Sequence, residues 1–316
     1  MKSDSFSIDL VYLWVDGNDP KWLKKRSLLF KEIGRNISTN FNGRYANNDE
    51  LKFSLRSVER YAPWIRKIFI VTDDQTPEWL DINNPKIKII DHKEILPDES
   101  LPCFNASVIE HFLHKIPNLS EYFLFSNDDT FFNKTVIPTN FFTNDGFPII
   151  RLNRKPFRRL RWFFREKILR KPHKLYSKAV FNAAELVNHK FGIFYNGLPH
   201  HNIDSYLKSD CARVAEQIFK NEIDSMKINH IRSVNDTHRA IYSYVALAEN
   251  RGHLRYVSSK ESLHVHIQKD RHYEKLIKFN PTFFCMNDTE YANDNDRIKL
   301  KIWLNDRFSE KSEFEK

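Results

Sequence analysis

Paired carboxylates follow three short apolar segments of the sequence. In the run YFLFSNDDTFF, Asp128 and Asp129 follow the mostly apolar residues 122–126 and Asn127. Carboxylates gathered at one edge of a sheet repel each other unless a cation or basic side chains join them. Hard oxygen ligands favour Mg²⁺ or Mn²⁺, which bridges carboxylates and a substrate diphosphate in such sites. The sequence therefore predicts a divalent cation site, and two further pairs follow the same pattern: Asp16 with Asp19, and Asp73 with Asp74.

A sheet whose strands end on one side would bring these carboxylates together. Segments rich in β-branched and aromatic residues and bounded by Gly, Pro, Asn or Asp predict strands at 8–15, 67–72, 87–91 and 122–126. Apolar residues at helical spacing predict a helix over 51–62, capped by Asn47 with Glu50, and a second helix over 105–114. The alternation predicts an α/β fold with a mostly parallel, Rossmann-like sheet flanked by helices, whose carboxyl strand ends bind ligands.

The positive charge is concentrated in one segment. Residues 151–174 hold eleven Lys or Arg against the single Glu166, a net charge of +10 in a chain whose total is +9. A helical stripe within this segment consists of Phe157, Leu160, Phe164 and Ile168. A basic amphipathic helix of this kind suits an anionic membrane surface, although it could also pack its stripe on its own domain. We expect no nucleic-acid partner, because no recognition motif accompanies the charge.

Other features bound the class of protein. The N-terminus has no apolar region of signal-peptide length, and no stretch of about 18 apolar residues occurs, so we expect a cytoplasmic protein with peripheral contact at the inner face of the membrane. Three widely spaced cysteines predict neither a disulfide framework nor a zinc site. The absence of GxGxxG and GxxxxGK[ST] argues against dinucleotide and P-loop sites. The expected organisation is a catalytic domain in two parts, 1–150 and 196–316, separated by a basic aromatic helical insertion at 151–195.

The sequence also resembles a known family. The segments IDLVYLWVDGNDP, RYANNDELKFSLRSVERYAPWIRKIFIVTDDQTPEWL and LPCFNASVIEHFLHKIPNLSEYFLFSNDDTFF are similar to the first two signature regions of the Stealth family of sugar-phosphate transferases. The segments LPHHNIDSYLK, INHIRSVNDTHRAIYSY and FCMNDTEYANDNDR resemble the third and fourth regions. The resemblance implies a nucleotide-sugar transferase-like fold. It also implies transfer of a sugar-1-phosphate from a nucleotide sugar to a hydroxyl of a glycan or lipid-linked polysaccharide, with release of a nucleoside monophosphate, in capsular or cell-surface polysaccharide synthesis.

The resemblance and the chemistry of phosphoryl transfer assign candidate roles. His200, expected at the start of a helix formed by the apolar series from Ile203 to Ile218, would accept the hydroxyl proton, with His201 as the alternative. Arg232 would stabilise the developing charge. The catalytic set is His200, Arg232, Asp129 and Asp16. The expected metal ligands are Asp128, Asp129 and Asp288, with Asp16 as a further candidate. The donor-binding residues are Asp16, Arg44, Asn48, Arg56, Asn105 and Asn127.

Simpler interpretations remain open for several of these residues. Arg232 could form an ion pair with Asp236, Asn48 could belong only to a helix cap together with Asp49 and Glu50, and Asp288 could lie in a turn. The family usually has Thr where this sequence has Cys103, so a hydroxyl contact there is in doubt. Two alternatives for the whole protein are a metal-dependent glycosyltransferase that releases a nucleoside diphosphate and a non-catalytic membrane-binding module.

Overall fold

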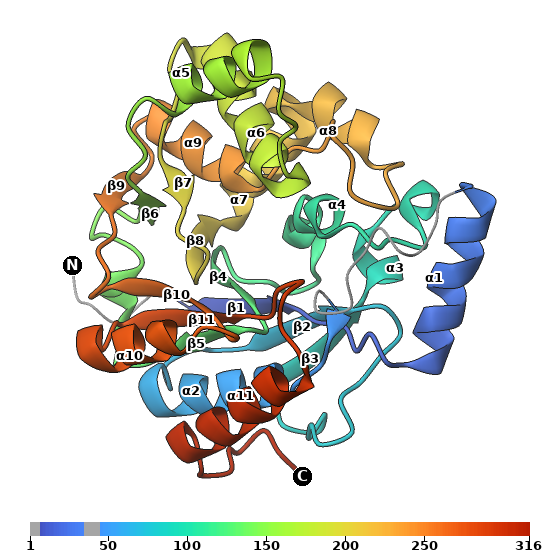
Figure 1. The fold of residues 1–316 in the computed structure, drawn as a ribbon, viewed down its shortest axis with the longest axis vertical. Coiled ribbons are helices and arrows are strands. Elements are labelled where there is room, and N and C mark those ends of the chain that lie inside the picture. The colour runs from blue at the N-terminus through green and yellow to red at the C-terminus, as the bar shows by residue number, and fades with distance from the viewer. Residues whose placement is uncertain (1–6, 35–44) are drawn as a thin grey trace.

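A five-stranded sheet forms the centre of the computed structural model, which describes residues 7–34 and 45–316 (Figure 1). The strand order is β3-β2-β1-β4-β8, and all neighbours are parallel except β8, which runs antiparallel to β4. The α/β fold with a mostly parallel sheet is therefore confirmed. The strands are β1 (Ile8–Leu13), β2 (Ile68–Thr72), β3 (Ile87–Asp91), β4 (Tyr122–Asn127) and β8 (Asp204–Leu207).

The register of this sheet aligns its carboxyl edge. Leu13, the last residue of β1, lies opposite Val71 of β2 and Asn127 of β4, so the segments that follow these strands leave the sheet at one level. Side chains alternate between two cores, with Val11 on one face and Tyr12 on the other. Helix α2 (Glu50–Tyr61) covers the Tyr12 face, and α4 (Ala106–Glu110) and α9 (Ala240–Ala248) cover the opposite face (Figure 1).

Two smaller sheets were not predicted. The first has the order β10-β11-β5, with β5 (Thr130–Phe132) directly after the Asp128–Asp129 turn, β10 (Ser262–His266) and β11 (Phe283–Asn287). Phe131 of β5 stacks on Phe284 of β11 with ring centroids 4.8 Å apart. The second has the order β7-β6-β9, formed by β6 (Ile149–Asn153), β7 (Leu198–Pro199) and β9 (His253–Tyr256). Apart from β10 with β11, whose paired residues are 21 positions apart, these pairings join segments that are more than 40 residues apart, which local patterns do not reveal.

The helix predicted to begin at His200 is wrong. Residues 204–207 form strand β8, and the helix α7 (Lys208–Arg213) begins only at Lys208, continuing as a π-turn (Val214–Ile218). Ile203 and Leu207 pack in one core and Tyr206 in the other, as a strand requires. A separation of four residues is even, so it fits one face of a strand as well as one face of a helix. The helix over 105–114 is also shorter than predicted, because a 3₁₀ turn (Leu113–Lys115) follows α4.

The basic segment is only partly exposed. Helix α5 (Arg158–Phe163) continues as a π-turn (Phe164–Ile168) at one extreme of the molecule, at the top of Figure 1. Phe157 is 70% exposed and Leu160 is 66% exposed, so the stripe does not pack on its own domain. Helix α6 (Leu175–Phe191), in contrast, packs into the same core as the central sheet. The domain boundaries at 150 and 195 stay predictions.

The other helices complete the layers around the sheets. They are α1 (Pro20–Glu32), α3 (His92–Ile95), α8 (Lys220–Met226), α10 (Asp270–Phe279) and α11 (Asp294–Arg307), with 3₁₀ turns at Asp98–Ser100 and Pro138–Asn140. Among the described residues, no helix is long and apolar enough to cross a membrane.

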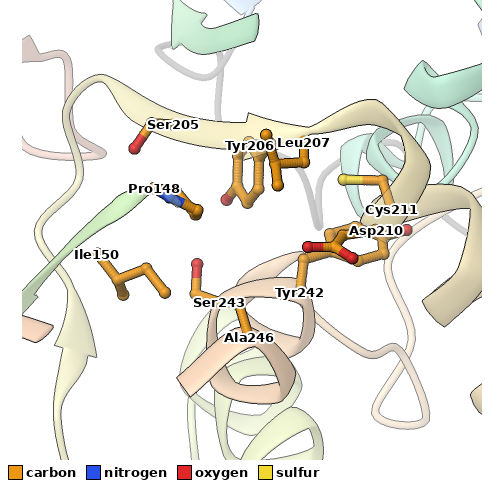
Figure 2. A pocket seen from close by; sticks show the side chains of 10 residues that line it. All are labelled: Pro148, Ile150, Ser205, Tyr206, Leu207, Asp210, Cys211, Tyr242, Ser243 and Ala246. Atoms are coloured by element: carbon orange, nitrogen blue, oxygen red, sulfur yellow. The ribbon is translucent and has the colours of Figure 1, made fainter. Parts of the chain in front are cut away.

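A small cavity of about 10 Å³ lies between β6, β8, α7 and α9, lined by Ile150, Tyr206 and Ala246 among others (Figure 2). It holds no more than about one water molecule.

Candidate active site

Three carboxylates meet at the carboxyl end of β4. Asp128 and Asp129 form the turn into β5, and Glu50 is the first residue of α2. Burial raises the pKa of Asp128 well above its usual value, and the charges of Asp129 and Glu50 raise it further. Burial likewise raises the pKa of Glu50 to about 7, although hydrogen bonds from Asn48 oppose this shift. The cluster therefore favours a proton or a cation over three free negative charges.

Asn48 holds the Glu50 carboxylate in place. Its backbone N–H donates to Glu50 Oε2 at 2.6 Å, and its side-chain amide donates to Oε1 at 2.7 Å. The predicted capping box of Asn47 with Glu50 is wrong, because Asp49, in the left-handed region with φ of 63°, is the N-cap and makes no side-chain cap bond. The Glu50 carboxylate thus accepts from Asn48, the residue just before the N-cap, and its charge acts on Asp128. Asn48 as a donor-binding residue stays a prediction.

Strand β11 positions Asp129 from the other side. The Met286 backbone N–H donates to the Asp129 carbonyl at 2.8 Å, and the Cys285 thiol donates to Asp129 Oδ2 at 3.2 Å. The second oxygen, Asp129 Oδ1, is buried and accepts no hydrogen bond from any described residue. Asp288 lies just beyond β11, where Arg297 donates to its carboxylate at 2.8 Å. Asp288 therefore lies after a strand and is already paired, and its role as a metal ligand stays a prediction.

Histidine rings adjoin the carboxylates. His201 has a backbone φ of 57°, an uncommon conformation for a residue with a side chain, and its ring centroid lies 5.0 Å from that of His264. One ligand atom each of His201, His264 and Cys285 lies within 4.8 Å of the other two. Because Cys285 also contacts Asp129, the histidines and the carboxylates share one site. Burial, followed by the charge of Arg239, lowers the pKa of His201 to about 4, so its ring is neutral at pH 7.

His200 has a different environment from its neighbour. Its side chain is fully buried, Nδ1 lies 3.1 Å from Ser262 Oγ, and Nε2 lies 3.2 Å from Asp204 Oδ1. Asp204 in turn pairs with Arg239 at 3.0 Å. These contacts fix the backbone that carries His201. Catalysis by His200 stays a prediction, and His201 is the neighbour that the structure places beside His264 and Cys285.

Arg232 lies in the loop between α8 and α9. Its positive charge is near enough to affect the pKa of His201, of Asp236 and of the buried Glu110, in each case as a smaller effect than burial. Asn105 ties this loop to α4, because its side-chain amide donates to Asp236 Oδ2 at 2.9 Å. Asn105 also caps α4 by accepting from the Ser107 N–H. The structure thus gives Asn105 a structural role, and its donor contact stays a prediction.

Asp16 and Gly17 lie at the end of β1. The Gln75 side chain accepts from the Asp16 N–H at 2.9 Å and donates to the Asp16 carbonyl at 3.0 Å, which joins the ends of β1 and β2. The Gly17 N–H donates to the Tyr45 carbonyl at 2.9 Å. A Cβ at Gly17 would overlap this carbonyl, so only glycine permits the approach. Asn127, the last residue of β4, lies beside this region through its pairing with Leu13.

Arg56 and Arg44 stay predictions as donor-binding residues, each for a different reason. The Arg56 guanidinium donates twice to the Glu315 carboxylate, at 2.8 and 2.7 Å, and once to the Phe308 carbonyl. These bonds direct Arg56 toward the C-terminal segment, so a donor contact would require breaking a two-bond ion pair; it stays a prediction. Arg44 lies outside the described residues.

Sequence reasoning missed three residues of this site. Glu50 was interpreted only as a capping residue, Cys285 only as a packing residue, and His264 was not considered. A signal for His264 exists in the alternation LHVHI, which places His264 and His266 on one face of β10. For Glu50 and Cys285 no local pattern distinguishes a site residue from a cap or a buried thiol.

Carboxylates, a neutral histidine and an arginine that meet at the strand ends of an α/β sheet are typical of an enzyme site. Comparison with known proteins defines the family. Residues 6–28 match conserved region 1 of Stealth proteins, and residues 44–150 match conserved region 2. The chain is 34% identical to the capsular polysaccharide phosphotransferase fcs1 of Haemophilus influenzae over 307 residues, covering 91% of this chain and 80% of that protein. The chain belongs to the Stealth family.

Other relatives agree with this assignment. The capsular polysaccharide phosphotransferase LcbA of Aeromonas hydrophila is 32% identical, over 96% of this chain and 85% of that protein. The exopolysaccharide phosphotransferase cps2G of Lactiplantibacillus plantarum is 45% identical over 146 residues, which are 46% of this chain and 42% of that protein. The expected enzyme class, a phosphotransferase, is confirmed by these relatives. The galactosyltransferase LgtC, solved with donor and acceptor sugar analogues, has a TM-score of 0.46 at 11% identity over 95% of both chains, too distant to bear on function.

Proposed function

We propose that the chain transfers a sugar-1-phosphate from a nucleotide sugar to a hydroxyl of a glycan or lipid-linked polysaccharide acceptor. The acceptor oxygen forms a bond to the phosphorus that carries the sugar, and the bond from that phosphorus to the nucleoside monophosphate breaks. The product is a phosphodiester of a capsular or cell-surface polysaccharide. The observation that carries the proposal is the meeting of the Asp128–Asp129–Glu50 cluster with the neutral His201 ring in one site.

The acidic cluster fits a divalent cation. Asp129 Oδ1 is buried without a hydrogen-bond partner among the described residues, and mutual repulsion with burial raises the pKa of Asp128. Asp128, Asp129 and Asp288 would hold Mg²⁺ or Mn²⁺, with Glu50 close behind them. When bound, the cation supplies charge neutralisation for the diphosphate of the donor.

Protein side chains perform the other steps. Because His201 is neutral at pH 7, its ring has a nitrogen lone pair that can orient the acceptor hydroxyl and take its proton as the oxygen attacks phosphorus. Arg232 stabilises the negative charge on the oxygens of the transferring group. Asp16 and Asn127, at the ends of β1 and β4, and Asn48, just before α2, bind the donor. His200, paired with Asp204, holds the backbone on which His201 is presented.

The identity of the released nucleotide tests this proposal. The purified chain is incubated with a panel of nucleotide sugars, Mg²⁺ and a short soluble glycan acceptor, and the nucleotide products are separated by chromatography. Release of a nucleoside monophosphate with gain of phosphate by the acceptor supports sugar-1-phosphate transfer. Release of a nucleoside diphosphate would show cleavage of the bond between the anomeric carbon and oxygen, as in a metal-dependent glycosyltransferase, and would refute the proposal.

The basic segment brings the enzyme to an anionic membrane surface. Phe157, Leu160 and Ile168 are at least 60% exposed and lie among Arg and Lys side chains of the same segment. Each Lys or Arg near an anionic leaflet contributes about 1 kcal/mol, and the attraction fades within about 8 Å at physiological salt. Trp162 anchors the segment to the protein, since it stacks on Phe181 with ring centroids 4.1 Å apart.

Vesicle binding tests the membrane contact. Wild type should sediment with anionic vesicles at low salt, less at high salt, and little with neutral vesicles. Arg161→Gln with Arg165→Gln should reduce sedimentation at least tenfold while transfer to a soluble acceptor is kept. A matched control, Lys21→Gln with Lys24→Gln on α1, removes the same charge elsewhere. Equal loss in both double variants would show that only net charge matters and would refute a dedicated surface at 151–174.

A further inference from the structure

A second kind of ligand set lies beside the acidic cluster. His264 of β10 and Cys285 of β11 are directly paired neighbours in the second sheet, and His201 approaches them from the loop between β7 and β8. One nitrogen of each histidine and Cys285 Sγ lie within 4.8 Å of one another. These three residues come from segments separated by 63 and 21 positions, so the sequence shows none of the usual spacings of a metal motif.

The geometry is close to that of a tetrahedral site. Metal–nitrogen and metal–sulfur distances of about 2.0 to 2.3 Å separate the ligand atoms of tetrahedral zinc by roughly 3.3 to 3.6 Å. The ligand atoms here lie within 4.8 Å of one another, and small side-chain rotations would bring them to the tetrahedral separation. Asp129 Oδ2 lies 3.2 Å from Cys285 Sγ and supplies a fourth ligand atom. His264 is exposed and Cys285 is buried, so a cation can reach the site from solvent through His264.

The ligand types select a different cation from that of the acidic cluster. Imidazole and thiolate are borderline or soft ligands, which bind Zn²⁺ well and Mg²⁺ poorly. Two neutral histidines with a thiolate and one carboxylate also balance the charge of a divalent ion. When the thiol proton leaves for solvent, Asp129 Oδ2 loses its hydrogen-bond donor and turns to the metal instead.

We propose that His201, His264 and Cys285, with Asp129, form an inhibitory Zn²⁺ site that overlaps the catalytic site. Zinc bound there occupies the His201 lone pair that would accept the acceptor proton, and draws one Asp129 oxygen away from the Mg²⁺ position. The inhibitory part of this inference rests on the proposed function. The binding part stands on the ligand geometry alone.

Cobalt binding tests the site without any need for activity. Co²⁺ reports tetrahedral coordination by its visible spectrum and thiolate ligation by a charge-transfer band in the near ultraviolet. The full chain should bind one Co²⁺ with this band, and Zn²⁺ should displace it. Cys285→Ser should abolish the band, and His264→Ala, at an exposed position, should weaken binding at least tenfold. Cys211→Ser, at another buried thiol, should leave the spectrum unchanged. Binding without the band, or a band that survives Cys285→Ser, would overturn the assignment.

Inhibition is measured separately from binding. Micromolar Zn²⁺ added to the Mg²⁺-dependent transfer assay should inhibit wild type, and His264→Ala should raise the inhibitory concentration at least tenfold. Equal inhibition of both proteins would overturn the regulatory role and place the inhibitory ion elsewhere. Should the chain show no transfer with any donor, the proposed function fails, whereas the cobalt titration still decides whether the site binds metal.

Discussion

The buried Glu50 carboxylate should make stability depend on pH in a predictable way. Its pKa is raised from 4.5 to about 7 by burial, with a further contribution from the charge of Asp129. Below pH 4.5 the group is protonated in both the folded and the unfolded state. As pH rises from 4.5 to 7, the unfolded state loses this proton while the folded state keeps it. The free energy of unfolding therefore falls across this window as the carboxyl ionises more readily in the unfolded chain.

The size of the effect follows from the shift. At 1.36 kcal/mol per pKa unit, the raised pKa corresponds to about 3 kcal/mol of stability lost by pH 8 in the absence of divalent cations. Glu50→Gln removes this titration. It keeps only one of the two carboxylate oxygens that accept hydrogen bonds from Asn48, and the loss of the other lowers the free energy of unfolding by about 1 kcal/mol. The variant should therefore be less stable than wild type by about 1 kcal/mol at pH 4.5 and more stable by about 2 kcal/mol at pH 8.

Urea denaturation in excess chelator, from pH 4.5 to 8, measures this crossover. Glu78→Gln, at an exposed carboxylate, serves as the control and should run parallel to wild type. Mg²⁺ at a hundredfold excess over its dissociation constant should restore about 2.7 kcal/mol to wild type at pH 8. If the free energy of unfolding of Glu50→Gln changed with pH in the same way as that of wild type, ionisation of Glu50 would cost the folded state nothing. The reasoning about the acidic cluster would then fail.

Three further outcomes are expected. Asp129→Asn should lower turnover by about 10³ or more, as should chelation, because a cation supplies several kcal/mol of transition-state stabilisation; activity that persists in excess chelator would contradict this. His201→Ala should lower turnover by about 10² to 10⁴ with its thermal midpoint nearly unchanged, whereas His200→Ala should mainly lower the midpoint, and the opposite pattern in the two assays would make His200 the base. Gly17→Ala should raise the KM for the donor and lower the thermal midpoint, because its Cβ displaces the Tyr45 carbonyl; unchanged values would show that this contact is loose.

Local sequence patterns correctly predicted the four parallel strands in the first half of the chain. The four strands of the parallel sheet are short, apolar and bounded by turn-forming residues, and each begins and ends within two residues of its predicted limits. The same patterns failed for residues 203–218, where a spacing of four satisfied a strand and a helix equally. The capping prediction at Asn47 failed because Asp49 is the N-cap of α2 and the Glu50 carboxylate accepts its hydrogen bonds from Asn48.

The sequence by itself determined the family, the α/β class and the Asp128–Asp129 pair, since strand composition and the residues after a strand are local properties. Tertiary structure alone decided which other side chains share the site. Cys285 lies 156 positions from Asp129, yet their side chains are in contact because β11 pairs with β5. His200 and His201 are adjacent and identical in type, and only the left-handed backbone at His201 and the buried pairing of His200 with Asp204 give them different surroundings. Such differences arise from packing between distant segments, which no local pattern encodes.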